Sequence, residues 1–170
     1  MSKMTSWHVG VAAEAFVAAQ FARLTYDVSV QYGANQPEYD LIAVDGDRML
    51  KISVKGSQDG SWGLTQGFKK GRTYHEAAQE WLNKHHKRTI FCLVQFKGTS
   101  ELQMPRMYLA SPKEIADQLC SEAGGRGDTI LYEHHEWGKA AAAYGTVDKL
   151  PEEWLFTEER VKEMFDSYGM

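Results

Sequence analysis

The chain has 170 residues, 43% of them hydrophobic, and a formal net charge of −4. This length and composition fit one domain, over residues 1–170, with a single core. The negative balance excludes a protein that binds nucleic acid through a globally basic surface. No apolar run approaches the roughly 18 residues of a transmembrane helix, no signal peptide is evident, and the two cysteines lack metal-ligand spacing. We therefore expect a cytoplasmic protein with reduced thiols and no membrane partner.

The first expected element is a helix over residues 6–24, with Thr5 or Ser6 as its N-cap. Glu14 is the only acidic residue in this helix, and its neighbours at helical spacing are apolar. A carboxylate on such a face needs a partner, because burying it alone costs several kcal/mol or forces it to take up a proton. The partner is either a buried Arg, Lys or Tyr, or a metal ion shared with Asp40.

A β-hairpin is expected next, because Asp45-Gly46-Asp47 is a strong turn signal between two strand-like runs, residues 39–44 and 48–55. If Gly46-Asp47 is a two-residue turn, Asp40 faces Ser53 and lies diagonal to Lys55, at roughly 7–8 Å. Two side chains at that spacing can meet at one ion or one phosphate. An Asp45-Gly46 turn would instead place Asp40 opposite Lys51. A three-residue loop would move Lys55 to the other face of the sheet and end a catalytic interpretation.

Residues 56–71 contain five glycines, and the basic residues Lys69, Lys70 and Arg72 lie at or directly after the end of this segment. We expect a mobile loop that closes over a nucleic-acid backbone, which these three residues would contact. The alternative is an ordinary flexible connection on the surface.

The rest of the chain alternates helices and strands. Two capping boxes, at residues 73–76 and 111–114, predict helices that run to about Lys84 and Cys120. The first box explains Glu76 without a metal, although Glu76 is also the nearest acid that could replace a missing ligand. Strands are expected at residues 89–96, 107–110 and 129–133, and further helices begin at Pro151 and Thr157. These elements predict an α/β (α+β) fold, with a central mixed β-sheet flanked by helices.

Three segments together resemble the PD-(D/E)XK nuclease superfamily, in particular its restriction-endonuclease-like and Holliday-junction-resolvase-like branches. They are Gly10-Val11-Ala12-Ala13-Glu14, Tyr39-Asp40-Leu41-Ile42-Ala43 and Ile52-Ser53-Val54-Lys55-Gly56-Ser57-Gln58. The resemblance implies Glu14 and Asp40 as ligands of Mg²⁺ or Mn²⁺, Lys55 as the residue that orients or activates the attacking water, and Gln58 as a further polar residue of the site. It also implies DNA as the partner and a homodimer as one arrangement of the chain.

Ser53 departs from this pattern, because the superfamily places Glu, Asp or sometimes Gln at this position. A serine hydroxyl is a neutral, weak ligand for Mg²⁺, which prefers charged and carbonyl oxygens. Two carboxylates remain, and the Val54 carbonyl could add a third oxygen. Two hypotheses follow: a metal-dependent nuclease that uses Glu14, Asp40 and Lys55, or a weakened or inactive member of the fold that binds DNA or a protein. An unrelated α/β domain is the third.

Overall fold

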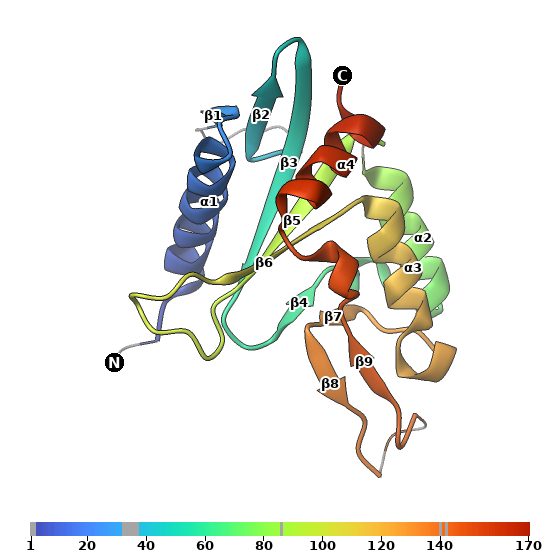
Figure 1. Ribbon diagram of the computed structural model, residues 1–170. Helices are drawn as coiled ribbons and strands as arrows, with labels where there is room; N and C mark the ends of the chain where they lie inside the picture. Colours follow the sequence, from blue (N-terminus) through green and yellow to red (C-terminus); the bar gives the residue numbers. More distant parts are fainter. Residues whose placement is uncertain (1–2, 32–37, 86, 140, 142) are drawn as a thin grey trace.

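The computed structural model describes residues 3–31, 38–85, 87–139, 141 and 143–170. Within these residues, the main feature is a five-stranded sheet in the order β1-β2-β3-β5-β6, covered by helices on both faces (Figure 1). Its strands are β1 (Asp27–Val30), β2 (Leu41–Asp45), β3 (Arg48–Ser57), β5 (Thr89–Gln95) and β6 (Arg106–Ala110). The α-helices are α1 (Ser6–Arg23), α2 (Tyr74–Lys84), α3 (Pro112–Ser121) and α4 (Glu158–Tyr168).

The sheet is mixed, as the sequence predicts. β1, β2 and β3 form an antiparallel meander, β3 pairs with β5 in parallel, and β5 pairs with β6 antiparallel. A parallel pair needs a crossover connection, and α2 lies within the connection from β3 to β5. β3 is therefore the central strand, with the hairpin partner on one side and the crossover partner on the other.

Local capping explains where three of the helices begin. The Thr5 hydroxyl accepts a hydrogen bond from the His8 N–H at 3.3 Å, which makes Thr5 the N-cap of α1. Both capping boxes form, at Thr73 for α2 and at Ser111 for α3. In the first box, the Glu76 carboxylate accepts the Thr73 N–H at 2.7 Å. Glu76 therefore serves the helix cap, as the sequence indicates.

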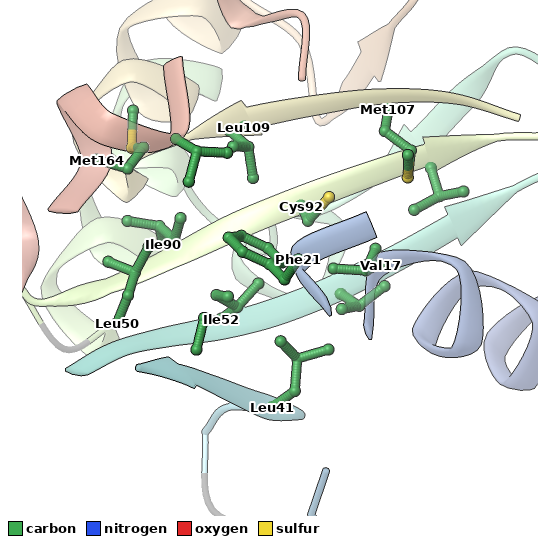
Figure 2. Close-up of a cluster of buried hydrophobic side chains, with 14 of the residues drawn as sticks. Val17, Phe21, Leu41, Leu50, Ile52, Ile90, Cys92, Met107, Leu109 and Met164 are labelled. Atoms are coloured by element: carbon green, nitrogen blue, oxygen red, sulfur yellow. The ribbon is translucent and has the colours of Figure 1, made fainter. Parts of the chain in front are cut away.

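Alternation along the strands builds two cores, one on each face of the sheet. One face packs against α1 and α4, through residues that include Val17, Phe21, Ile52, Cys92 and Met164 (Figure 2). The opposite face packs against α2 and α3, and here β5 contributes Phe91 and Leu93. Helices that cover both faces of a mixed sheet confirm the predicted fold class.

Other parts of the chain differ from the sequence prediction. β4 (Ser61–Gly63) pairs with β7 (Ile130–Tyr132), and β8 (His134–Glu136) pairs with β9 (Val147–Lys149). The predicted strand 129–133 is therefore too long. Pro151 precedes only a 3₁₀ turn (Glu152–Trp154), because the cap of α4 at Thr157 follows too closely for an α-helix.

Two further expectations concern the membrane and the cysteines. No helix among the described residues is long and apolar enough to cross a membrane. Cys92 is buried, Cys120 is partly buried, and both are free thiols, as the sequence predicts.

Candidate active site

The hairpin that carries Asp40 and Lys55 takes the first of the three registers that the sequence allows. Asp45 lies opposite Arg48, and Leu41 lies opposite Ile52, so Gly46 and Asp47 form a two-residue turn. Gly46 adopts a φ of 61°, the positive value that a type II′ turn requires at its first central position. Extending this register by one residue places Asp40 beside Ser53.

Asp40 is fixed against β3 by hydrogen bonds. Its Oδ2 atom accepts the Val54 N–H at 2.6 Å, and the Ser53 hydroxyl lies 3.5 Å from the same oxygen as a donor. The N–H and C=O of one strand residue point to the same side of the strand. The Val54 carbonyl therefore lies on the side of β3 from which Asp40 approaches, which agrees with its expected place beside the acid.

Glu14 joins Asp40 from α1. The helix buries Val9, Ala13, Val17 and Phe21 against the sheet, and Glu14 follows Ala13 on a half-buried edge of this face. Burial raises the pKa of the Glu14 carboxyl, the nearby Asp40 carboxylate raises it further, and Lys55 lowers it. The two charge effects place Asp40 and Lys55 within electrostatic reach of Glu14.

Lys55 comes from the central strand. Its side chain is exposed, and its carbonyl accepts a hydrogen bond from Nε1 of Trp62 at 2.9 Å, which holds this part of β3 in place. Ser53 and Lys55 alternate with Val54, and they lie beside Phe91 and Leu93 of β5. In the described part of the chain, Lys55 forms no salt bridge.

Gly56 brings α1 and β3 together at this point. A Cβ on Gly56 would lie 2.8 Å from Val9 Cγ1, 2.9 Å from Ala13 Cβ and 2.9 Å from the Val9 carbonyl oxygen. Only glycine allows so close an approach. The position of Glu14 relative to Lys55 is therefore set by direct packing of the helix on the strand.

Ser53, the residue that departs from the pattern expected from the sequence, is buried, at 4% exposure. Its hydroxyl points toward Asp40. Among the residues that the structure describes, no group of three or more His, Cys, Asp or Glu side chains is arranged to hold a metal ion. The expected ligands are thus two carboxylates, Glu14 and Asp40, and the Val54 carbonyl, and their binding of a metal ion stays a prediction. Mg²⁺ is commonly held by one or two carboxylates together with water and substrate phosphate.

Gln58 follows the end of β3. Its side-chain N–H donates to the Met4 carbonyl at 2.7 Å, so it ties the segment before α1 to the sheet. It also lines a hollow of 410 Å³ together with Lys55 and Gly56. Glu14 and Asp40 do not line this hollow, and the expected role of Gln58 in the site stays a prediction.

The glycine-rich segment 56–71 is not the mobile loop that we expect from its sequence. Residues 61–63 form β4 against β7, Trp62 is buried, and the N–H groups of Leu64 and Thr65 bond to the Thr129 carbonyl. The prediction of a closing loop is wrong, because long-range pairing and the anchored tryptophan order the segment.

The three basic residues at its end lie before α2. Lys69 packs over the ring of Tyr74 at 4.6 Å, and Arg72 donates to the Phe68 carbonyl at 3.3 Å. Lys70 and Arg72 are exposed. Their expected contact with nucleic acid remains a prediction.

Comparison with known proteins gives one structural likeness. No protein-family model matches the chain, and no curated protein matches it. A bacterial homing endonuclease of known structure is similar, with 15% sequence identity and a TM-score of 0.38, over 65% of this chain and 68% of that one.

The sequence does not predict the structural roles of two residues, Gly56 and His85. Gly56 gives a weak signal, since a glycine inside a strand marks a bulge or a close approach. His85 gives none beyond a basic run. In the structure, its Nδ1 pairs with Glu38 at 2.6 Å, and its ring contacts Trp81 and Phe91. Burial lowers the pKa of His85, the hydrogen bond to Glu38 raises it, and the charge of Lys55 lowers it.

Proposed function

We propose that this chain is a nuclease that hydrolyses phosphodiester bonds in DNA with Mg²⁺ or Mn²⁺. The observation that carries the proposal is the convergence of Glu14 from α1, Asp40 from the residue before β2, and Lys55 from β3. A structural ion pair would explain the same three residues, but Lys55 forms no salt bridge with any described carboxylate. An unpaired ammonium beside two carboxylates is suited to a phosphate that arrives with the substrate.

The residues divide the work as follows. Glu14, Asp40 and the Val54 carbonyl would hold the ion, since burial and the Asp40 carboxylate disfavour ionisation of Glu14 and a divalent cation would relieve this cost. When bound, the ion supplies charge stabilisation and lowers the pKa of water. Lys55 would contact the phosphate and orient the water. Ser53 holds Asp40 in place, and Gln58 supports the rim. Hydrolysis adds one water across a P–O ester bond and leaves a phosphate monoester and a hydroxyl group.

Ser53 favours a second candidate function. A site with one carboxylate fewer binds its ion more weakly, and a chain that has lost the ion would keep the fold and the exposed Lys55. Such a chain would be a DNA-binding or protein-interaction module without cleavage. The buried position of Ser53 beside Asp40 makes it the residue that separates the two candidates.

Metal titration by calorimetry tests the proposal. We expect the parent to bind Mn²⁺ weakly, Asp40→Ala to lose binding, and Ser53→Glu to bind more tightly because it restores a carboxylate beside Asp40. Asp117→Ala is the matched control, since Asp117 is an exposed carboxylate on α3 paired with Lys113. If neither the parent nor Ser53→Glu binds Mg²⁺ or Mn²⁺, the metal site and the nuclease function are both lost.

A cleavage assay then separates the two candidates. The substrates are a supercoiled plasmid, a four-way junction and a single strand, each with Mn²⁺. Cleavage by the parent that disappears in Asp40→Ala and Lys55→Ala supports the nuclease. Cleavage by Ser53→Glu alone, with DNA binding by both proteins, supports the inactive binding module.

A further inference from the structure

Trp7 differs from the other tryptophans of this chain. Three of the five are at most 4% exposed (Trp62, Trp81 and Trp154), and Trp137 donates its Nε1–H to Asp148. Trp7 is 70% exposed, in the first turn of α1. Trp7 does not stand alone, because Val11, one turn later on the same helix face, is 48% exposed. Contiguous exposed apolar surface marks a binding surface, whereas a single exposed side chain does not.

Trp7 adjoins the candidate active site. It lines a hollow of 650 Å³ together with Val11 and Glu14. Residues 7, 11 and 14 lie one and two turns apart on the same face of a helix. One end of this hollow is therefore an exposed indole, and the other contains a carboxylate of the site.

A second hollow continues from the first across α1. Ser6 and Gly10 line both the hollow of Trp7 and the hollow of 410 Å³ that contains Lys55. Gly10 lies inside the helix, and a Cβ there would meet nothing within 4 Å. Packing does not demand glycine at this position, where alanine would favour the helix more. Because Gly10 has no side chain, nothing projects from this part of α1 between the indole and the Lys55 ammonium.

The chemistry of this path fits a nucleotide that is not stacked in a duplex. An indole offers a flat apolar surface on which any base can stack, while the ammonium offers a partner for a phosphate. Inside a regular duplex the faces of each base are covered by its neighbours, so away from the duplex ends a base can reach Trp7 only if it is unpaired. The net negative charge of the chain also disfavours a binding mode that tracks a duplex by charge alone.

We infer that Trp7 is a stacking platform for an unpaired nucleotide, whose backbone crosses α1 at Gly10 toward Lys55. This inference rests on the proposed DNA-cleaving function, and it names the class of substrate: single strands, or duplexes with an unpaired base.

The test is binding without cleavage, with Ca²⁺ in place of Mg²⁺. A short fluorescein-labelled single strand, the same sequence as a blunt duplex, and the duplex with one extra unpaired base are titrated with protein and followed by anisotropy. We expect Trp7→Ala to weaken binding of the single strand and of the bulged duplex by about 5- to 150-fold. Trp7→Phe should keep most of the affinity. Tyr144→Ala is the control, because Tyr144 is 61% exposed on a segment outside α1.

A second readout reports stacking itself. A fluorescent base analogue at the unpaired position should be quenched by the parent and by Trp7→Phe, but not by Trp7→Ala. Thermal unfolding of Trp7→Ala should match the parent, since the side chain is exposed.

The two failures are distinguishable. If DNA binds and Lys55→Ala weakens it, while Trp7→Ala changes neither affinity nor quenching, the stacking platform is refuted and the nuclease proposal survives. An equal loss for the blunt duplex refutes the preference for unpaired bases. If none of the three DNA forms binds the parent, both proposals are overturned.

Discussion

Gly56→Ala should move the helix that carries Glu14 away from the strand that carries Lys55. The new methyl group would lie 2.8 Å from Val9 Cγ1 and 2.9 Å from both Ala13 Cβ and the Val9 carbonyl oxygen. Because backbone and short side chains form these contacts, no flexible side chain can swing aside. The whole of α1 has to retreat from β3.

The size of the effect follows from ordinary contact distances. Carbon atoms pack best at about 3.5–4.0 Å, so α1 must shift by about 0.7–1.2 Å from a contact of 2.8 Å. Overpacking of this kind costs about 1–3 kcal/mol, and replacing a strand glycine by alanine returns about 0.5–1 kcal/mol. We expect a net loss of about 1–2 kcal/mol in the free energy of unfolding. A misplacement of about 1 Å lowers activity by about 100-fold.

Urea unfolding and the Mn²⁺-dependent cleavage assay measure these two quantities. Gly10→Ala is the matched control for the unfolding measurement alone, since its methyl group meets nothing within 4 Å on the same helix α1. It should raise the free energy of unfolding by about 0.5–1 kcal/mol. If Gly56→Ala is as stable as the parent and keeps its metal affinity and cleavage rate, the contact between α1 and β3 does not position Glu14.

Three further predictions concern single residues. Burial raises the pKa of Glu122 to about 9, and its Oε2 has no hydrogen-bond partner in the described part of the chain. The folded state therefore keeps a proton that the unfolded chain loses above its ordinary pKa of 4.5. The free energy of unfolding should fall by up to about 1.4 kcal/mol per pH unit as the pH rises from 4.5 toward 9. Urea unfolding across this range should show the slope in the parent and lose it in Glu122→Gln, and equal slopes would contradict the assignment. Glu14→Gln should raise the free energy of unfolding at neutral pH without metal, because the raised pKa of Glu14 means that folding disfavours its charge. The same variant should lose metal binding in calorimetry. A less stable variant in EDTA would show that Glu14 has a favourable structural partner instead. Trp62→Phe removes the hydrogen bond to the Lys55 carbonyl and should lower the free energy of unfolding by about 1–2 kcal/mol together with the cleavage rate, whereas unchanged values would show that Trp62 does not brace Lys55.

Local signals account for the parts of the fold that the sequence predicts. The boxes at Thr73 and Ser111 fix two helix starts, since each involves only four consecutive residues. The sequence leaves three registers of the hairpin possible, because Asp45-Gly46 and Gly46-Asp47 are both good two-residue turns and a three-residue loop also fits. The observed register places Leu41 and Ile52 in one core, and only that packing decides between the turns.

Long-range contacts explain the errors. β4 is three residues long and pairs with residues about 70 positions later in the chain, as the match of Trp62 with Leu131 shows. No periodicity within residues 56–71 indicates that partner, so the glycines suggest a mobile loop. His85 and Glu38 likewise are 47 positions apart in the sequence and come together only in the folded chain. The candidate site residues could be predicted from the sequence because they lie on one helix and one hairpin. The residues that hold them in place come from more distant parts of the chain.

The two cores divide the site between separate parts of the molecule. Glu14 belongs to the helix on one face, whereas Ser53 and Lys55 lie beside residues of the other core. Substitutions confined to α1 would therefore remove the ion while the sheet, its register and Lys55 remained. In the descent of such a protein, an enzyme can become a binding protein through changes in one helix, without passing through an unfolded ancestor.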